Sequence, residues 1–229
     1  TGKTLFGPKW SLGYSGSTMH YTDAPDAQNQ LMNFIRLCEE HAIPCDSFQL
    51  SSGYTSINGK RYVFNWNHKR FPDPKKFFEN MNARGINVIP NLKPGILKRH
   101  PYIDLFEKND VFIKTPDGKA PYYGRWWGGE GRFFDFTGPK GRDTWKQLLE
   151  ENILKMGTKT VWNDNCEMDG VEDRDAQCDF EGKKGTMAEL KILHSNLMAY
   201  TAKHALAEVY PGERPYIINR AGYAGIQRY

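Results

Sequence analysis

The 229-residue chain has only four cysteines, and no two of them form a CxxC pair. Cys38, Cys45, Cys166 and Cys178 also lack the Cys/His spacing of zinc-binding motifs, so we expect no structural zinc site. Four cysteines are too few for a disulfide framework in a chain of this length. We therefore expect reduced thiols, most of them buried, and no metal or other cofactor.

The sequence also lacks long apolar runs and a large excess of charge of one sign. No segment approaches the ~18 consecutive apolar residues of a membrane span. Residues 1–10 lack a basic region followed by an apolar run, so no signal peptide is visible; this favours a cytoplasmic location and leaves the compartment otherwise open. The 31 basic and 27 acidic residues are interleaved and sum to +4, whereas nucleic-acid binding needs a concentrated basic face. We expect neither a nucleic acid nor a membrane as partner.

The composition and the predicted elements indicate one globular α/β domain. The chain is 39% hydrophobic and 14% aromatic, enough for a core, and no repeat or linker interrupts it. Apolar runs predict strands at residues 9–14, 46–50, 86–92, 160–164 and 215–220, with an edge strand or hairpin arm at 61–66. Caps and helical spacing predict helices at about 26–42, 74–85, 102–108, 142–156 and 187–209. The alternation favours a parallel sheet with helices outside it.

The connections differ in character. Residues 93–138 form an irregular insertion with a hairpin near residues 116–118, and the acidic segment 169–181 is expected to be a surface loop.

Ligands of parallel α/β sheets bind at the carboxyl ends of the strands. The predicted ends lie at residues 14–17, 51–54, 93, 164–167 and 220–223, and Trp66, Trp126 and Trp127 could wall the same opening. Carboxylates, an arginine and tryptophans around one opening suit a sugar, because its ring faces stack on indole and its hydroxyls need charged or amide partners.

The most informative motif is Trp-Asn-Asp-Asn-Cys-Glu at residues 162–167, in which Asp164 stands at the carboxyl end of a predicted apolar strand. Taken alone, this carboxylate could equally be a helix cap or half of an ion pair. Three further segments occur with it in order: FNWNHKRFPDP at 64–74, FFDFTGP at 133–139 and YIINRAGYAGIQRY at 216–229. Together they resemble glycoside hydrolase family 31, the retaining α-glucosidase and α-xylosidase family. The resemblance implies the first part of a (β/α)8 TIM barrel over residues 1–229, with about five strands, outer helices and an irregular insertion after strand 3.

The resemblance also implies roles for single residues. Asp164 matches the catalytic nucleophile, and Arg220 matches the arginine that binds the sugar in subsite −1. Trp126 or Trp127 matches a tryptophan that lines the pocket. Trp66 falls on another pocket aromatic, with core packing as the alternative.

Two residues of the same motif are expected to support the site. Glu167 and Asn165 follow the nucleophile, and we expect them to act by hydrogen bonding. A scaffold salt bridge remains the alternative role for Arg220.

Three positions and one absence depart from the family. One position is the nucleophile motif, which reads Asp-Asn-Cys-Glu at residues 164–167 instead of Asp-Met-Asn-Glu. Ser51 stands where the family has an aspartate that holds the 4-hydroxyl of a glucose-like sugar, and Lys93 stands where it has another aspartate. A buried polar group without its partner costs about 1–3 kcal/mol. We therefore leave an α-glucoside, an α-galactoside and an N-acetyl-α-galactosaminide open as substrates.

The absence is that the chain ends at Tyr229, before the W-x-G-D-N motif that carries the acid/base of the family. We expect a truncated catalytic domain that is inactive by itself. The alternative is a non-catalytic carbohydrate-binding protein, and the oligomeric state stays open.

Overall fold

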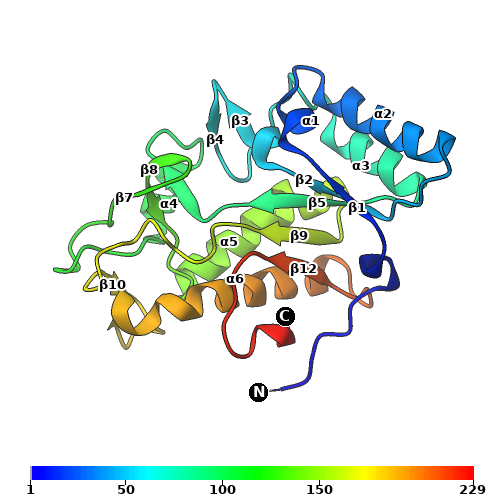
Figure 1. Cartoon of the computed structure of the whole chain (residues 1–229). Helices are drawn as coiled ribbons and strands as arrows, with labels where there is room; N and C mark the ends of the chain where they lie inside the picture. The colour runs from blue at the N-terminus through cyan, green and yellow to red at the C-terminus, as the bar shows by residue number, and fades with distance from the viewer. Residues whose placement is uncertain (1) are drawn as a thin grey trace.

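The computed structural model describes residues 2–229 and contains one five-stranded parallel sheet (Figure 1). The strand order is β1-β2-β5-β9-β12, and each neighbouring pair is parallel. The strands are β1 (Ser15–Ser17), β2 (Ser47–Leu50), β5 (Asn87–Leu92), β9 (Thr160–Asn163) and β12 (Tyr216–Asn219). Because spatial order follows chain order, the sheet is built like five consecutive strands of a barrel wall.

Helices connect these strands. They are α1 (Met19–Asp23), α2 (Ala27–Glu40), α3 (Pro74–Ala83), α4 (Ile103–Lys108), α5 (Pro139–Asn152) and α6 (Met187–Val209). In Figure 1, α2 and α3 lie together at one end of the sheet, and α5 lies beside α6. Of the helices in the described residues, none is long and apolar enough to cross a membrane. The predicted α/β class is confirmed.

Local sequence explains where two of these helices begin. The Asp73 side chain accepts a hydrogen bond from the backbone N–H of Lys76 at 2.9 Å, and Pro74 occupies the first turn of α3, where no partner for its nitrogen is needed. Thr186 and Glu189 form a capping box at the start of α6.

A small antiparallel sheet fills the insertion after β5. Its order is β6-β8-β7, with β6 (Gly95–Leu97), β8 (Gly129–Phe133) and β7 (Gly124–Trp126). Two ribbons pair β3 (Ser56–Ile57) with β4 (Lys60–Arg61) and β10 (Gln177–Cys178) with β11 (Gly185–Thr186). Short 3-10 turns lie at Lys9–Leu12, Ser52–Thr55, Leu154–Met156 and Ile226–Arg228.

Three local predictions are corrected. The first strand is not at residues 9–14: a 3-10 turn occupies Lys9–Leu12, and β1 follows it at Ser15–Ser17. A glycine favours a turn, but a Cβ on Gly16 would lie 2.9 Å from the rings of Phe34 and Phe48. Close packing, and not turn geometry, accounts for the glycine.

The other two corrected predictions concern residues 61–66 and residues 169–181. Residues 61–66 contribute only Arg61 to a strand, since Phe64 has a positive φ of 66° that breaks extension. The segment 169–181 is not wholly a surface loop, because it carries β10 and buries Val171 and Cys178. The hairpin near residues 116–118 is confirmed by an antiparallel bridge between Lys114 and Pro121.

Aromatic side chains make up much of the core between the sheet, the insertion and α5. Trp145 of α5 is fully buried, with its ring centroid 4.7, 5.0 and 5.1 Å from those of Phe64, Phe134 and Phe136. Such edge-to-face contacts stabilise a core beyond the burial of area alone.

Candidate active site

Three polar side chains follow three adjacent strands at one edge of the sheet. Lys93 follows β5, Asp164 follows β9, and Arg220 follows β12. The backbone N–H of Asp164 donates to the Leu92 carbonyl at 2.8 Å, and that of Arg220 donates to the Asn163 carbonyl at 3.0 Å. The strand ladders therefore continue up to these residues and fix where their side chains start.

The Asp164 carboxylate is the centre of this group. It is 7% exposed, and its Oδ2 accepts hydrogen bonds from Asn91 Nδ2 at 3.1 Å and from the Lys93 ammonium. Its Oδ1 accepts from the backbone N–H of Asn165 at 2.9 Å and lies 3.2 Å from Nη1 of Arg220. Both oxygens are thus held by donors.

These donors decide the charge of Asp164. Burial raises the pKa of the carboxyl, but the hydrogen bond and charge of Lys93, the Asn91 amide and the charge of Arg220 outweigh burial and lower the pKa below its ordinary value. For Lys93, burial lowers the pKa, and Asp164 opposes that effect only in part. Asp164 is therefore ionised at neutral pH, as a nucleophile must be.

Asn165 and Glu167 contact the two cations. Asn165 adopts a positive φ of 53°, and its Oδ1 accepts a hydrogen bond from Lys93 Nζ at 2.9 Å. Glu167 accepts from Arg220 Nε at 3.2 Å and also pairs with Nη2 of that guanidinium. The contacts fit the supporting roles expected for both residues, and those roles stay predictions.

A cavity of about 230 Å³ opens above Asp164. It brings together six of the residues singled out in the sequence: Ser51, Lys93, Trp127, Asp164, Asn165 and Arg220. Ser51 is 5% exposed, whereas Trp127 is 57% exposed and its ring centroid lies 5.1 Å from Lys93 Nζ. An exposed indole at the rim of a charged cavity has the disposition of a sugar-stacking platform.

Two tryptophans lie elsewhere. Trp126 packs on Gly95, where a Cβ would come within 2.4 Å of its ring, and it does not line the cavity above Asp164. Trp66 is 8% exposed, donates its indole N–H to the Asn152 carbonyl at 2.8 Å and packs 4.6 Å from the ring of Tyr54. The structure thus supports the core-packing alternative for Trp66.

Three lining residues were missed in the sequence, namely Met19, Asn91 and Trp162, while a fourth, Ser52, lies within the predicted strand end at 51–54 without having been singled out. Asn91 had a usable signal, because it precedes Lys93 by two residues and alternate residues of a strand point to the same face. Trp162 stands two residues before Asp164 and could have been found by the same argument. Met19 enters from α1, and no local pattern indicates that approach.

Comparison with known proteins identifies the family. The chain matches the model of the glycosyl hydrolases family 31 TIM-barrel domain over residues 4–229. It belongs to glycoside hydrolase family 31. The expected barrel fold is thereby confirmed, and the five parallel strands are its N-terminal portion.

The relatives are glycosidases of greater length. The chain is 31% identical to alpha-glucosidase 2 of Bacillus thermoamyloliquefaciens, covering 100% of this chain and 29% of the relative. It is 30% identical to neutral alpha-glucosidase AB of Sus scrofa, covering 100% and 24%. The chain thus spans between a quarter and a third of the first and about a quarter of the second.

Solved structures agree on the fold. A glucosidase II alpha subunit bound to alpha3-Glc2 superposes with a TM-score of 0.86 at 25% identity, covering 100% of this chain and 25% of that one. A dextranase of Flavobacterium johnsoniae complexed with glucose gives a TM-score of 0.87 at 24% identity, covering 100% and 28%. The second likeness shows the fold alone.

Proposed function

We propose that a polypeptide containing this chain is a retaining α-glycosidase that releases terminal non-reducing α-linked sugars, with Asp164 as its nucleophile. The observation that carries the proposal is a buried carboxylate, kept ionised by Lys93 and Arg220, at the base of an open cavity. The α-glucosidases among its relatives support the same reaction class.

The proposed chemistry follows from this carboxylate. Asp164 attacks the anomeric carbon, the glycosidic bond breaks, and a covalent glycosyl-enzyme forms that water then hydrolyses. Arg220 holds sugar hydroxyls with its fixed fork of donors and keeps Asp164 ionised. Trp127 covers a ring face at the rim.

The reaction also needs a proton donor for the leaving oxygen, roughly 5–5.5 Å from the nucleophile. Glu167 is held in its ion pair with Arg220 and is assigned to positioning. By the family resemblance, the acid belongs to a motif that follows the segment matching residues 216–229. General acid catalysis supplies about 10²–10⁴-fold, so residues 1–229 alone should not hydrolyse unactivated glycosides.

A second candidate concerns the sugar. Ser51 and Lys93 both line the cavity beside Asp164, and they present a hydroxyl and an ammonium where the family has carboxylates. The carboxylate that would accept a hydrogen bond from an equatorial 4-hydroxyl is thus replaced. This favours a sugar with an axial 4-hydroxyl, an α-galactoside or an N-acetyl-α-galactosaminide, over an α-glucoside.

The test is a panel of aryl α-glycosides against the longest natural polypeptide that contains this chain, with Asp164→Asn beside an exposed control, Asp104→Asn. We expect Asp164→Asn to lose about 10⁴-fold or more in kcat, while the control keeps wild-type turnover. Sugar binding that persists in both variants without turnover in the wild type would establish a carbohydrate-binding protein instead. A clear preference for the α-glucoside would refute the axial-hydroxyl specificity.

A further inference from the structure

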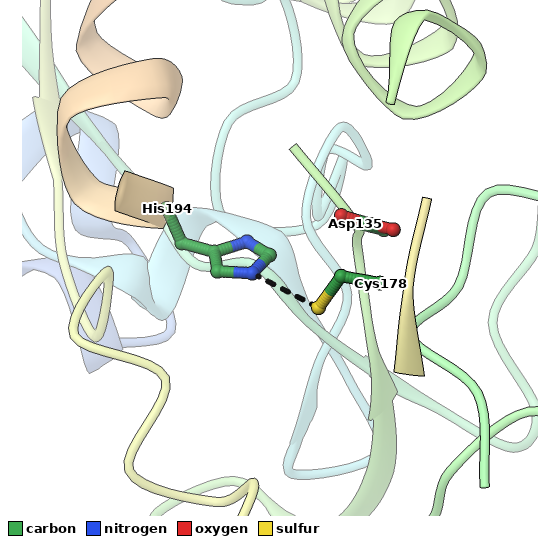
Figure 2. A group of neighbouring side chains, drawn as sticks. All are labelled: Asp135, Cys178 and His194. Carbon is green, nitrogen blue, oxygen red and sulfur yellow. Dashed lines mark hydrogen bonds between the residues drawn. The ribbon is translucent and has the colours of Figure 1, made fainter. Parts of the chain in front are cut away.

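A second cluster of reactive side chains lies away from the Asp164 cavity. Asp135, Cys178 and His194 converge from three separate segments, namely the end of β8, the ribbon strand β10 and helix α6 (Figure 2). One potential ligand atom of each lies within 4.8 Å of the others, and all three side chains are buried. None of them lines the cavity above Asp164.

The distances fit a tetrahedral metal ion. Cys178 Sγ lies 3.6 Å from His194 Nε2. Two ligands on a tetrahedral zinc, one at about 2.3 Å through sulfur and one at about 2.05 Å through nitrogen, stand about 3.6 Å apart. A carboxylate oxygen of Asp135 is the third corner of a triangle with the sulfur of Cys178 and the ring nitrogen of His194 (Figure 2).

Of the three side chains, the His194 ring is the one that the surrounding core leaves without a full set of partners, whereas the Cys178 thiol also contacts Met187 Sδ at 3.4 Å. His194 is 0% exposed, its Nε2 contacts only the thiol sulfur, and its Nδ1 has no hydrogen-bond partner within residues 2–229. A buried polar atom without a partner carries a desolvation cost and requires an explanation. Coordination through Nε2 would give that nitrogen a ligand and leave Nδ1 as the N–H of the neutral ring.

The Asp135 carboxylate is held ready for a cation. Its Oδ1 accepts from the backbone N–H and the hydroxyl of Thr137, at 2.9 and 2.6 Å. Its Oδ2 accepts from the backbone N–H of Asp179 at 2.6 Å, which leaves a further lone pair on that oxygen. Ordered carboxylates of this kind accompany histidine and cysteine at zinc sites.

The charge of the three side chains and their access to a cavity also fit a bound zinc ion. A thiolate, a carboxylate and a neutral imidazole bring two negative charges to one divalent cation, so the buried site carries no net charge. Asp135 and Cys178 both line a cavity of about 290 Å³ that is separate from the one above Asp164. The cavity provides an entry path and room for water as the fourth ligand.

We propose that Asp135, Cys178 and His194 bind one zinc ion, with water from the adjoining cavity as the fourth ligand. The thiol proton leaves to solvent as the metal–sulfur bond forms. The ion joins β8, β10 and α6, and it thereby ties the segment after the nucleophile strand to the helix that follows. CxxC spacing could not indicate such a site, because its ligands come from distant segments.

The experiment uses the longest natural polypeptide that contains this chain, stripped with a chelator and titrated with zinc or cobalt(II) alone. We expect one zinc per chain by elemental analysis. Cobalt(II) should give the intense visible bands of a tetrahedral ion and a sulfur-to-metal charge-transfer band. Zinc at a hundredfold excess over its Kd should raise the Tm of this longer polypeptide by about 2–4 °C.

Matched variants decide the ligands. Cys178→Ala and His194→Gln should each abolish the charge-transfer band and the zinc-dependent rise in Tm. Cys38→Ala and His100→Gln alter equally buried residues outside the cluster and should retain both effects. If the first two variants fail to fold, the wild-type titration still decides. Absence of stoichiometric zinc or of the charge-transfer band in the wild-type protein, or retention of both by folded Cys178→Ala, would overturn the proposal.

Discussion

Replacing Lys93 by methionine removes the ammonium from Asp164, the proposed nucleophile, and leaves most of the side-chain volume in place. Asp164 would keep the Asn91 amide, the Asn165 backbone N–H and Arg220, but its burial would be less well compensated. A hydrogen bond to a charged group contributes about 1.5–3 kcal/mol, and we expect Lys93→Met to lower the free energy of unfolding by that amount near neutral pH.

The pH dependence has a defined sign. The native pKa of Asp164 is lowered, so its ionised form contributes stability that is present above the unfolded value of about 3.9 and is lost as the pH falls through the native value. The stability difference between wild type and Lys93→Met should therefore shrink below about pH 4. In the variant the pKa of Asp164 rises, and the acidic limb of kcat/KM should move to higher pH.

The assay uses the longest natural polypeptide that contains this chain and combines urea unfolding at several pH values with the pH profile of kcat/KM. Lys98→Met is the matched control, because Lys98 pairs with Glu130 on the surface with 61% of its side chain exposed. It should change stability by less than about 0.5 kcal/mol. The reasoning is refuted if Lys93→Met is as stable as that control, or if the acidic limb stays where it is in the wild type.

The remaining predictions concern a positioning contact and a packed glycine. Glu167→Gln frees Arg220, which is 46% exposed and therefore contributes little to stability. We expect KM to rise up to about tenfold, equivalent to 1.4 kcal/mol, with Tm nearly unchanged; a fall in kcat at constant KM would mean that Glu167 takes part in the chemistry. Gly16→Ala forces a Cβ to 2.9 Å from the rings of Phe34 and Phe48. Denaturant unfolding should show a loss of about 1–3 kcal/mol, and a variant as stable as the wild type would contradict this account of β1.

Much of the barrel could be predicted from the sequence because its signals are local. Four of the five strand predictions overlap the observed strands, since a strand of a parallel sheet covered by helices appears as a short apolar run; β5 is largely buried, whereas β12 is only partly buried. The first strand failed because the sequence Ser-Gly-Ser has no such run and is held by packing of Phe34 and Phe48 against Gly16. Helix starts were predictable from caps such as Asp73 and Thr186, whose partners lie within three residues.

The residues of the candidate site likewise fall into those that local sequence signals predict and those that they do not. Lys93, Asp164 and Arg220 each end an apolar run, and parallel strands bring their carboxyl ends to one edge, so their proximity follows from the pattern. The choice between Trp126 and Trp127 as the cavity residue does not follow from the sequence pattern. It depends on which face of the insertion hairpin packs against Gly95.

Sequence by itself determined the fold family, the strand ends and the segment that carries the proposed nucleophile, because periodicity and motifs record interactions between near neighbours. Only the tertiary structure decided that Lys93 pairs with Asp164, that Trp66 belongs to the core and that His194 meets Cys178 and Asp135. Those contacts join residues tens of positions apart in most cases. Their energies depend on burial and on partners that no local spacing records.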